Sequence, residues 1–126
     1  MSESTIEVLM TMPFSAALVE RVKAVSNRVN VTVLPAVKPE EIPAEVWART
    51  EVLYTDRVLP TPAQAPRLRF IQFHYAGIDY AAESPILRKP DLVAATLSGA
   101  VSSQVAEWSV AMLLALGHRI PEMMAL

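Results

Sequence analysis

The segment with the most suggestive chemistry covers residues 73–79, which read Phe-His-Tyr-Ala-Gly-Ile-Asp and follow an apolar run. A small residue followed by Gly77 lets backbone N–H groups come close to an anion, so this loop can hold a carboxylate. A tight turn also uses glycine, and the residues alone leave both interpretations open. His74 can act as a general acid, contact a substrate or serve a structural role, because the sequence identifies no carboxylate partner for it.

Hydroxyl groups form a second set of candidates. Tyr54 and Tyr75 can each present a hydroxyl group to a ligand or pack as structural residues. Ser102 and Ser103 precede a long apolar segment, where a serine either caps a helix or contacts a ligand at the positive end of that helix. Capping by one serine leaves the other available to a ligand.

The sequence lacks the motifs of a self-contained catalyst. Its three glycines, Gly77, Gly99 and Gly117, are too far apart for a Gly-x-Gly-x-x-Gly motif or a Walker loop, so the chain has no phosphate-binding motif of its own. It has no cysteine, no paired histidines and no serine in a nucleophile-elbow context. We therefore expect no metal site and no catalytic residue in this chain.

Five short apolar, β-branched runs predict the strands that position the candidate residues. They cover residues 6–10, 29–34, 52–54, 68–73 and 92–95. The intervening segments predict an amphipathic helix over residues 15–26, capped by its first serine, a short helix at residues 43–49, and a helix over about residues 80–87 capped by Asp79.

Alternating strands and helices predict an α/β fold with a parallel sheet and helices on both faces. Five strands favour the flavodoxin-like order 2-1-3-4-5. Ligands of such sheets bind beyond the carboxyl ends of the strands, so function is expected in the loops that follow them. These loops cover residues 11–14, 35–37, 55–57, 74–79 and 96–103.

The chain ends in a long apolar helix, expected over residues 103–118. Within residues 108–116 only Ser109 is polar, so the helix has no solvent-facing stripe and needs partners on every side, yet it is too short to cross a bilayer. We therefore divide the chain into a substrate-binding domain, residues 1–102, and a helix for interdomain or dimer contacts, residues 103–126. If the chain ends at Leu126, this helix is expected to pack against a second copy.

Composition limits the class of partner. The 126 residues are 52% hydrophobic and 19% charged, which is typical of one globular domain with a real core. A formal net charge of −2 gives no basic surface for nucleic acid or an anionic membrane. The absence of cysteine and of a signal-peptide pattern at the amino terminus favours a cytoplasmic protein.

Two stretches resemble the amino-terminal part of the NAD(P)-dependent D-isomer-specific 2-hydroxyacid dehydrogenases. The first, residues 68–79, has the family's apolar strand, small residue, glycine, apolar residue and aspartate. The second, residues 98–107, has a glycine-containing loop and the Val-Ala-Glu signature at Val105 to Glu107, followed by a helix rich in leucine and alanine. In element order the resemblance covers the whole chain.

The resemblance implies a flavodoxin-like substrate-binding domain, joined by the long helix to a Rossmann domain that begins soon after this chain ends. It implies that the backbone of Ala76 and Gly77 holds a substrate carboxylate, that Tyr54 and Tyr75 line the site, and that Ser102 meets the nicotinamide end of NAD or NADP. In the full-length protein, hydride would pass between NAD(P) and a small 2-oxo or 2-hydroxy acid. The family's catalytic arginine, glutamate and histidine match no residue here, so this chain alone is expected to be inactive and to bind no cofactor.

The resemblance also implies a homodimer through residues 103–118. The sequence departs from the family pattern at Tyr75, often a smaller residue, at residues 55–57, where many members carry Arg-Ser, and at Trp108, which replaces a common histidine. These differences leave the substrate and the choice between NAD and NADP open.

Two alternatives compete with this interpretation. A receiver domain shares the fold and would use Asp56 as phosphoryl acceptor, but Mg²⁺ needs acidic residues after the first strand, where residues 11–13 read Thr-Met-Pro. The second alternative is a free-standing, non-catalytic binding or dimerisation module of the same fold. The coding frame beyond Leu126 separates it from the dehydrogenase, which predicts a glycine-rich fingerprint within roughly 30 residues.

Overall fold

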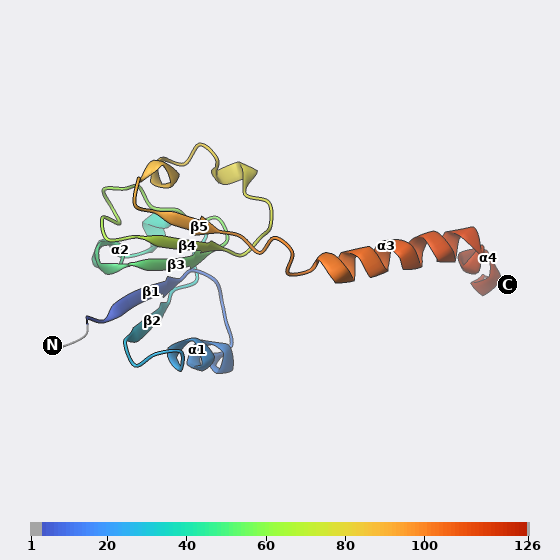
Figure 1. The fold of residues 1–126 in the computed structure, drawn as a ribbon, viewed down its shortest axis with the longest axis horizontal. Coiled ribbons are helices and arrows are strands. Elements are labelled where there is room, and N and C mark those ends of the chain that lie inside the picture. The colour runs from blue at the N-terminus through green and yellow to red at the C-terminus, as the bar shows by residue number, and fades with distance from the viewer. Residues whose placement is uncertain (1–3, 126) are drawn as a thin grey trace. The chain divides into compact units, whose positions relative to one another are not determined.

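The fold is a five-stranded, entirely parallel sheet in a computed structural model that describes residues 4–125. Its strands are β1 (Ile6–Met10), β2 (Val29–Val33), β3 (Val52–Thr55), β4 (Phe70–Phe73) and β5 (Val93–Ala95). Their order is β2-β1-β3-β4-β5 (Figure 1). This order confirms the predicted topology and places the point where strand order reverses between β1 and β3.

The chain divides into two compact units, Met1–Thr96 and Leu97–Leu126. The first unit contains the whole sheet, and the second contains the last two helices. The division predicted at residue 102 concerns function and stays a prediction. Each unit is described by itself below.

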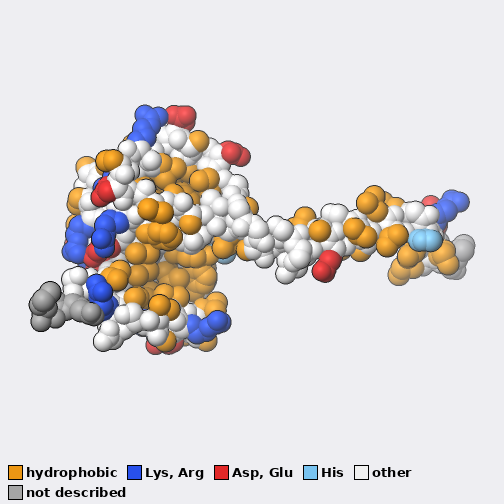
Figure 2. All heavy atoms as spheres, in the orientation of Figure 1, with side chains coloured by type: hydrophobic (Ala, Val, Ile, Leu, Met, Phe, Trp, Pro, Cys, Tyr) orange, Lys and Arg blue, Asp and Glu red, His pale blue; other side chains and the backbone are white. Residues whose placement is uncertain are grey.

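Helix α1 (Ala16–Lys23) covers one face of the sheet. Ser15 caps it as predicted, because its Oγ accepts a hydrogen bond from the Leu18 backbone N–H at 3.4 Å. Val22 of this helix lines the same shallow hollow as Val8 of β1 and Tyr54 of β3. Figure 2 shows hydrophobic side chains gathered beside α1 on the visible side of this unit.

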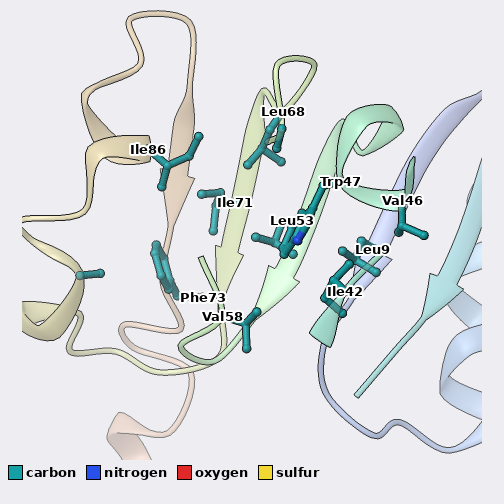
Figure 3. Close-up of a cluster of buried hydrophobic side chains, with 12 residues drawn as sticks. Leu9, Ile42, Val46, Trp47, Leu53, Val58, Leu68, Ile71, Phe73 and Ile86 are labelled. Atoms are coloured by element: carbon teal, nitrogen blue, oxygen red, sulfur yellow. The ribbon is translucent and has the colours of Figure 1, made fainter. Parts of the chain in front are cut away.

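The main hydrophobic core lies on the opposite face. Leu9, Leu53 and Ile71 are in register across β1, β3 and β4 and are each at most 1% exposed. Helix α2 (Ala44–Arg49), which follows the short 3-10 helix η1 (Pro39–Glu41), packs Trp47 against them (Figure 3). Ile86 joins the same cluster from the segment before β5. Apolar side chains on alternate strand positions thus bury this face of the sheet. The face beside α1 is only partly covered, since Val52 and Tyr54 are half-buried and Val93 is 59% exposed.

The helix predicted over residues 80–87 is wrong. Two 3-10 helices, η2 (Asp79–Ala81) and η3 (Pro85–Arg88), occupy this segment. Asp79 lies within η2 and does not cap it, since Ile78 holds the N-cap position. Pro85 explains the break, because proline lacks an N–H and disfavours the helical conformation of the preceding residue; Ser84 is extended at φ −64° and ψ 127°.

The second unit consists of α3 (Ser102–Gly117) and α4 (Ile120–Met124). Between them Arg119 has the left-handed conformation, with φ 55°. Large apolar side chains of α3 are exposed, namely Val105, Trp108, Val110, Met112, Leu113, Leu114 and Leu116. Within residues 4–125, no helix combines the length and hydropathy needed to span a lipid bilayer.

Candidate ligand site

The candidate site lies where β3 and β4 end. Tyr54 pairs with Gln72, and Thr55 pairs with Phe73, so the two strands end side by side at the same edge. Because side chains alternate along a strand, Tyr54 and His74 emerge on the face opposite the buried Phe73. The parallel sheet therefore brings together two candidates that are 20 residues apart.

Tyr54 and His74 are joined directly. A hydrogen bond links Tyr54 Oη to His74 Nδ1 at 2.8 Å, and both residues are half-buried. Burial raises the pKa of the Tyr54 hydroxyl above its ordinary value. The phenol therefore keeps its proton at neutral pH, and the pair can present a defined hydrogen-bonding surface to a ligand.

Two further rings hold this pair in place. The ring of Phe14, from the loop after β1, lies edge-on to Tyr54 with 5.1 Å between centroids and to His74 with 6.5 Å. Tyr75 lies edge-on to His74 with 5.2 Å between centroids. Edge-to-face contacts of this kind favour one ring orientation. Predicted site residues Tyr54 and Tyr75 thus both pack against the imidazole.

Ala76 and Gly77 continue the loop and are exposed. Gly77 does not have a positive φ, and a Cβ added to it would meet no atom within 4 Å. Neither backbone strain nor close packing therefore requires a glycine here. The exposed backbone is compatible with a carboxylate contact and with a turn, and both interpretations stay predictions.

Ser102 is the first residue of α3, in the second unit. The N-cap position belongs to Val101, and no side chain caps the helix. Of the two roles left open for Ser102 and Ser103, capping of α3 is therefore not the one that the structure shows. The assignment of Ser102 to a cofactor stays a prediction.

A second hollow, of about 200 Å³, lies at the reversal of strand order between β1 and β3. It is lined by Thr11, Met12, Pro13, Asp56, Arg57 and Val58, among others. Asp56 Oδ1 is buried without a hydrogen-bond partner in the described part of the chain, although Arg57 Nε lies 3.5 Å away. Beneath it, the Thr11 hydroxyl donates to Thr55 Oγ1 at 2.7 Å, which ties the two strand ends together.

Arg57 is also fixed by Tyr80. Its guanidinium carbon lies 4.7 Å from the centre of the Tyr80 ring, and the Tyr80 hydroxyl donates to the Asp56 backbone oxygen at 2.6 Å. Burial first, and then the negative charge of Asp56, raise the pKa of Tyr80. The loop after β3 therefore carries an ordered cation beside the site.

The described residues do not fit a dinucleotide pyrophosphate on their own. A phosphate cradle needs glycines close together where the backbone approaches the phosphate, whereas Gly77, Gly99 and Gly117 lie in three separate segments. A Cβ at any of the three would meet no atom within 4 Å, so none marks a close backbone approach. Residues 4–125 alone therefore provide no glycine-rich cradle for the pyrophosphate of a nicotinamide cofactor.

Sequence reasoning found the loops but missed two of their contributors. Phe14 lies in the predicted loop after β1. The sequence gives no sign of its role, because its contacts with Tyr54 and His74 depend on tertiary structure. Arg57 appeared only as a departure from a family pattern. The sequence did contain one sign of a role for Arg57, because it is a cation that directly follows an aspartate at the end of a strand.

The protein is an α/β domain with an open parallel sheet, and its candidate ligand site lies at the carboxyl edge of that sheet. Two solved structures are similar to it. Phosphoglycerate dehydrogenase from Lactobacillus plantarum has a TM-score of 0.59 and 20% identity, with 87% of this chain and 34% of that chain covered. A phosphoglycerate oxidoreductase from Rhizobium etli has a TM-score of 0.58 and 17% identity, with 92% and 37% covered.

This chain thus spans about a third of the length of either dehydrogenase. At these identities the likeness shows a shared fold. No protein-family model and no curated protein sequence matches the chain.

Proposed function

We propose that this chain is the substrate-binding domain of an NAD(P)-dependent 2-hydroxyacid dehydrogenase. The observation that carries the proposal is that nearly the whole chain shares the fold of about a third of two dehydrogenases that act on a phosphorylated hydroxy acid by name. The two sequence stretches that resemble this family, residues 68–79 and 98–107, add support. The complete enzyme would move hydride between NAD(P) and a 2-oxo or 2-hydroxy acid in the cytoplasm.

The role proposed for this chain is to bind and orient the acid. The exposed backbone of Ala76 and Gly77 would hold the carboxylate, with Tyr54 and Tyr75 beside it. Ser102 would meet the nicotinamide end of a cofactor that is held mainly by a Rossmann domain outside this chain. The isolated chain should therefore bind acids weakly and catalyse nothing.

Acid binding is tested by titrating the 126-residue chain with pyruvate, glyoxylate and phosphoglycerate while recording backbone amide NMR spectra. We expect at least one acid to shift the Ala76 and Gly77 amide resonances in a saturable way, because an anion polarises the N–H groups that it accepts from. Methyl pyruvate, which keeps the 2-oxo group and lacks the carboxylate, should leave them in place. Equal responses to pyruvate and its ester would argue against carboxylate recognition.

Turnover and the coding frame give two further tests. The pure chain with NADH and the same acids should show no oxidation of NADH, and clear turnover would contradict the proposal that the catalytic residues lie elsewhere. In the gene, a Gly-x-Gly-x-x-Gly motif is expected within roughly 30 codons after Leu126. A stop codon at that point would favour the free-standing module instead.

We also propose that two copies associate through residues 103–118. The support is the exposed apolar surface of α3, where Trp108 is 64% and Leu113 is 71% exposed. The same surface supports the second candidate function, a non-catalytic dimerisation module, because both need α3 to be covered by a partner.

Association is tested by measuring molar mass in solution with light scattering over a range of concentrations. The wild-type chain should be dimeric, and Leu113→Glu should make it monomeric, because a buried carboxylate without a partner opposes association. Val37→Glu places the same charge on a still more exposed apolar residue of the first unit, 82% against 71% for Leu113, and should leave the mass unchanged. A monomeric wild type would overturn this interface.

A further inference from the structure

The hydrogen bond between Tyr54 and His74 determines which nitrogen of the imidazole faces the ligand. A phenol hydroxyl is a strong donor, and its oxygen is a weak acceptor. Since the raised pKa of Tyr54 keeps the phenol protonated, the hydroxyl can donate to His74 Nδ1, and its stronger donor character favours this direction of the bond. A neutral imidazole that accepts at Nδ1 carries its proton on Nε2.

His74 Nε2 has no hydrogen-bond partner among residues 4–125. The ring is half-buried, with Phe14 and Tyr75 packed edge-on to it, so its orientation is restricted. An N–H group that is held in place beside apolar rings gains more from a hydrogen bond than one in bulk water, because the local dielectric constant is lower. This geometry favours an acceptor oxygen opposite Nε2.

We propose that Tyr54 holds His74 in the Nε2-protonated tautomer, and that the Nε2–H group donates a hydrogen bond to an oxygen of a small carboxylic acid at the carboxyl edge of β3 and β4. The ligand class rests on the function proposed above; the tautomer rests on the hydrogen bond alone. His74 is then a substrate-binding residue and Tyr54 a positioning residue that acts through it.

The position of the pair supports a carboxylic acid as the ligand. His74 lies two residues before Ala76 and three before Gly77, whose exposed backbone is the proposed carboxylate contact. A donor on one side and backbone N–H groups on the other can bind the two oxygens of one carboxylate.

The tautomer is tested first, without any ligand, by long-range ¹H–¹⁵N NMR of the imidazoles at about pH 8.5, where imidazoles are neutral. The chain has two histidines, so exposed His118 serves as an internal reference. We expect His74 Nδ1 to have the shift of an unprotonated acceptor, and Tyr54→Phe to move that shift while His118 stays fixed. Tyr80→Phe also removes a donating tyrosine hydroxyl, which is bonded to the Asp56 backbone oxygen and not to His74, and should move neither.

The donor role is tested by titrating the variants with pyruvate, glyoxylate and phosphoglycerate at the same pH. His74→Phe keeps a flat ring without a donor, and should weaken binding about tenfold or more, the loss expected for a hydrogen bond to a charged oxygen. His74→Gln restores an N–H donor at a similar distance from the backbone and should recover part of that loss. Tyr54→Phe should weaken binding by a smaller factor, because His74 can then adopt either tautomer.

The outcomes separate this inference from the function on which it rests. A protonated Nδ1 in the wild type, or an unchanged shift in Tyr54→Phe, overturns the tautomer. Acid binding that is equally tight in His74→Phe overturns the donor role and leaves the substrate-binding domain intact. If none of the three acids binds the wild type, both the donor role and the proposed function fail.

Discussion

Replacing Trp47 by alanine should lower the free energy of unfolding by about 3–5 kcal/mol, the usual cost of removing a large aromatic ring from a core. Trp47 is 1% exposed and packs between α2 and β3 in the main core. Its indole N–H also donates to the Pro39 backbone oxygen at 3.0 Å, so the substitution removes both a large apolar volume and the partner of a carbonyl group. Urea unfolding followed by circular dichroism measures the change.

Two further variants test the reason for this loss. Trp47→Phe keeps much of the ring and removes the hydrogen bond, so it should cost clearly less than the alanine variant. Val37→Ala removes apolar atoms from a side chain that is 82% exposed and should change stability by less than about 0.5 kcal/mol. A loss for Trp47→Ala no larger than that for Val37→Ala would mean that the core does not depend on α2.

The second large effect is expected at Glu51, a nearly buried carboxylate at the amino end of β3. Arg67 Nη2 lies 2.6 Å from its Oε1, and Arg69 Nη2 lies 2.9 Å from its Oε2, while the Glu51 side chain is only 10% exposed. Replacing both arginines by alanine leaves this carboxylate poorly solvated and without a cation. The free energy of unfolding should fall by about 2–3 kcal/mol, less than for a fully buried pair because the arginines are themselves exposed.

The chain provides matched controls for this ion pair. Arg88 and Glu83 form a pair of similar length, 2.9 Å, with side chains that are 71% and 91% exposed, so Arg88→Ala should cost at most about 0.5 kcal/mol. Adding Glu51→Gln to the double arginine variant should recover part of the loss, because it removes the unpaired charge. If the third substitution makes the protein still less stable, the unpaired charge is not the cause.

The strands and their order were predictable because each strand is a short apolar, β-branched run between helical or turn segments. Each predicted run matches its observed strand to within two residues at either end. Residues 79–88 differ from the predicted helix because Pro85 interrupts the helical backbone and leaves two short 3-10 helices, η2 and η3.

The candidate site was predictable only in outline. Its loops follow from the rule that ligands bind at the carboxyl edge of a parallel sheet. The hydrogen bond between Tyr54 and His74 was not predictable, because it depends on the register of β3 with β4 and on which face each side chain takes. The register of neighbouring strands comes from packing across the whole sheet, and a single sequence records it weakly.

The ion pair at Glu51 and the pair at Tyr54 lie at opposite ends of the same strand, β3. Substitutions at the Glu51 end are expected to change the free energy of unfolding, and under the proposed function substitutions at the Tyr54 end change ligand binding. Stability and ligand binding can therefore change separately in evolution. A descendant of this sequence can acquire a new ligand at the Tyr54 end, while the arginines at the Glu51 end offset the loss of stability that the new site causes.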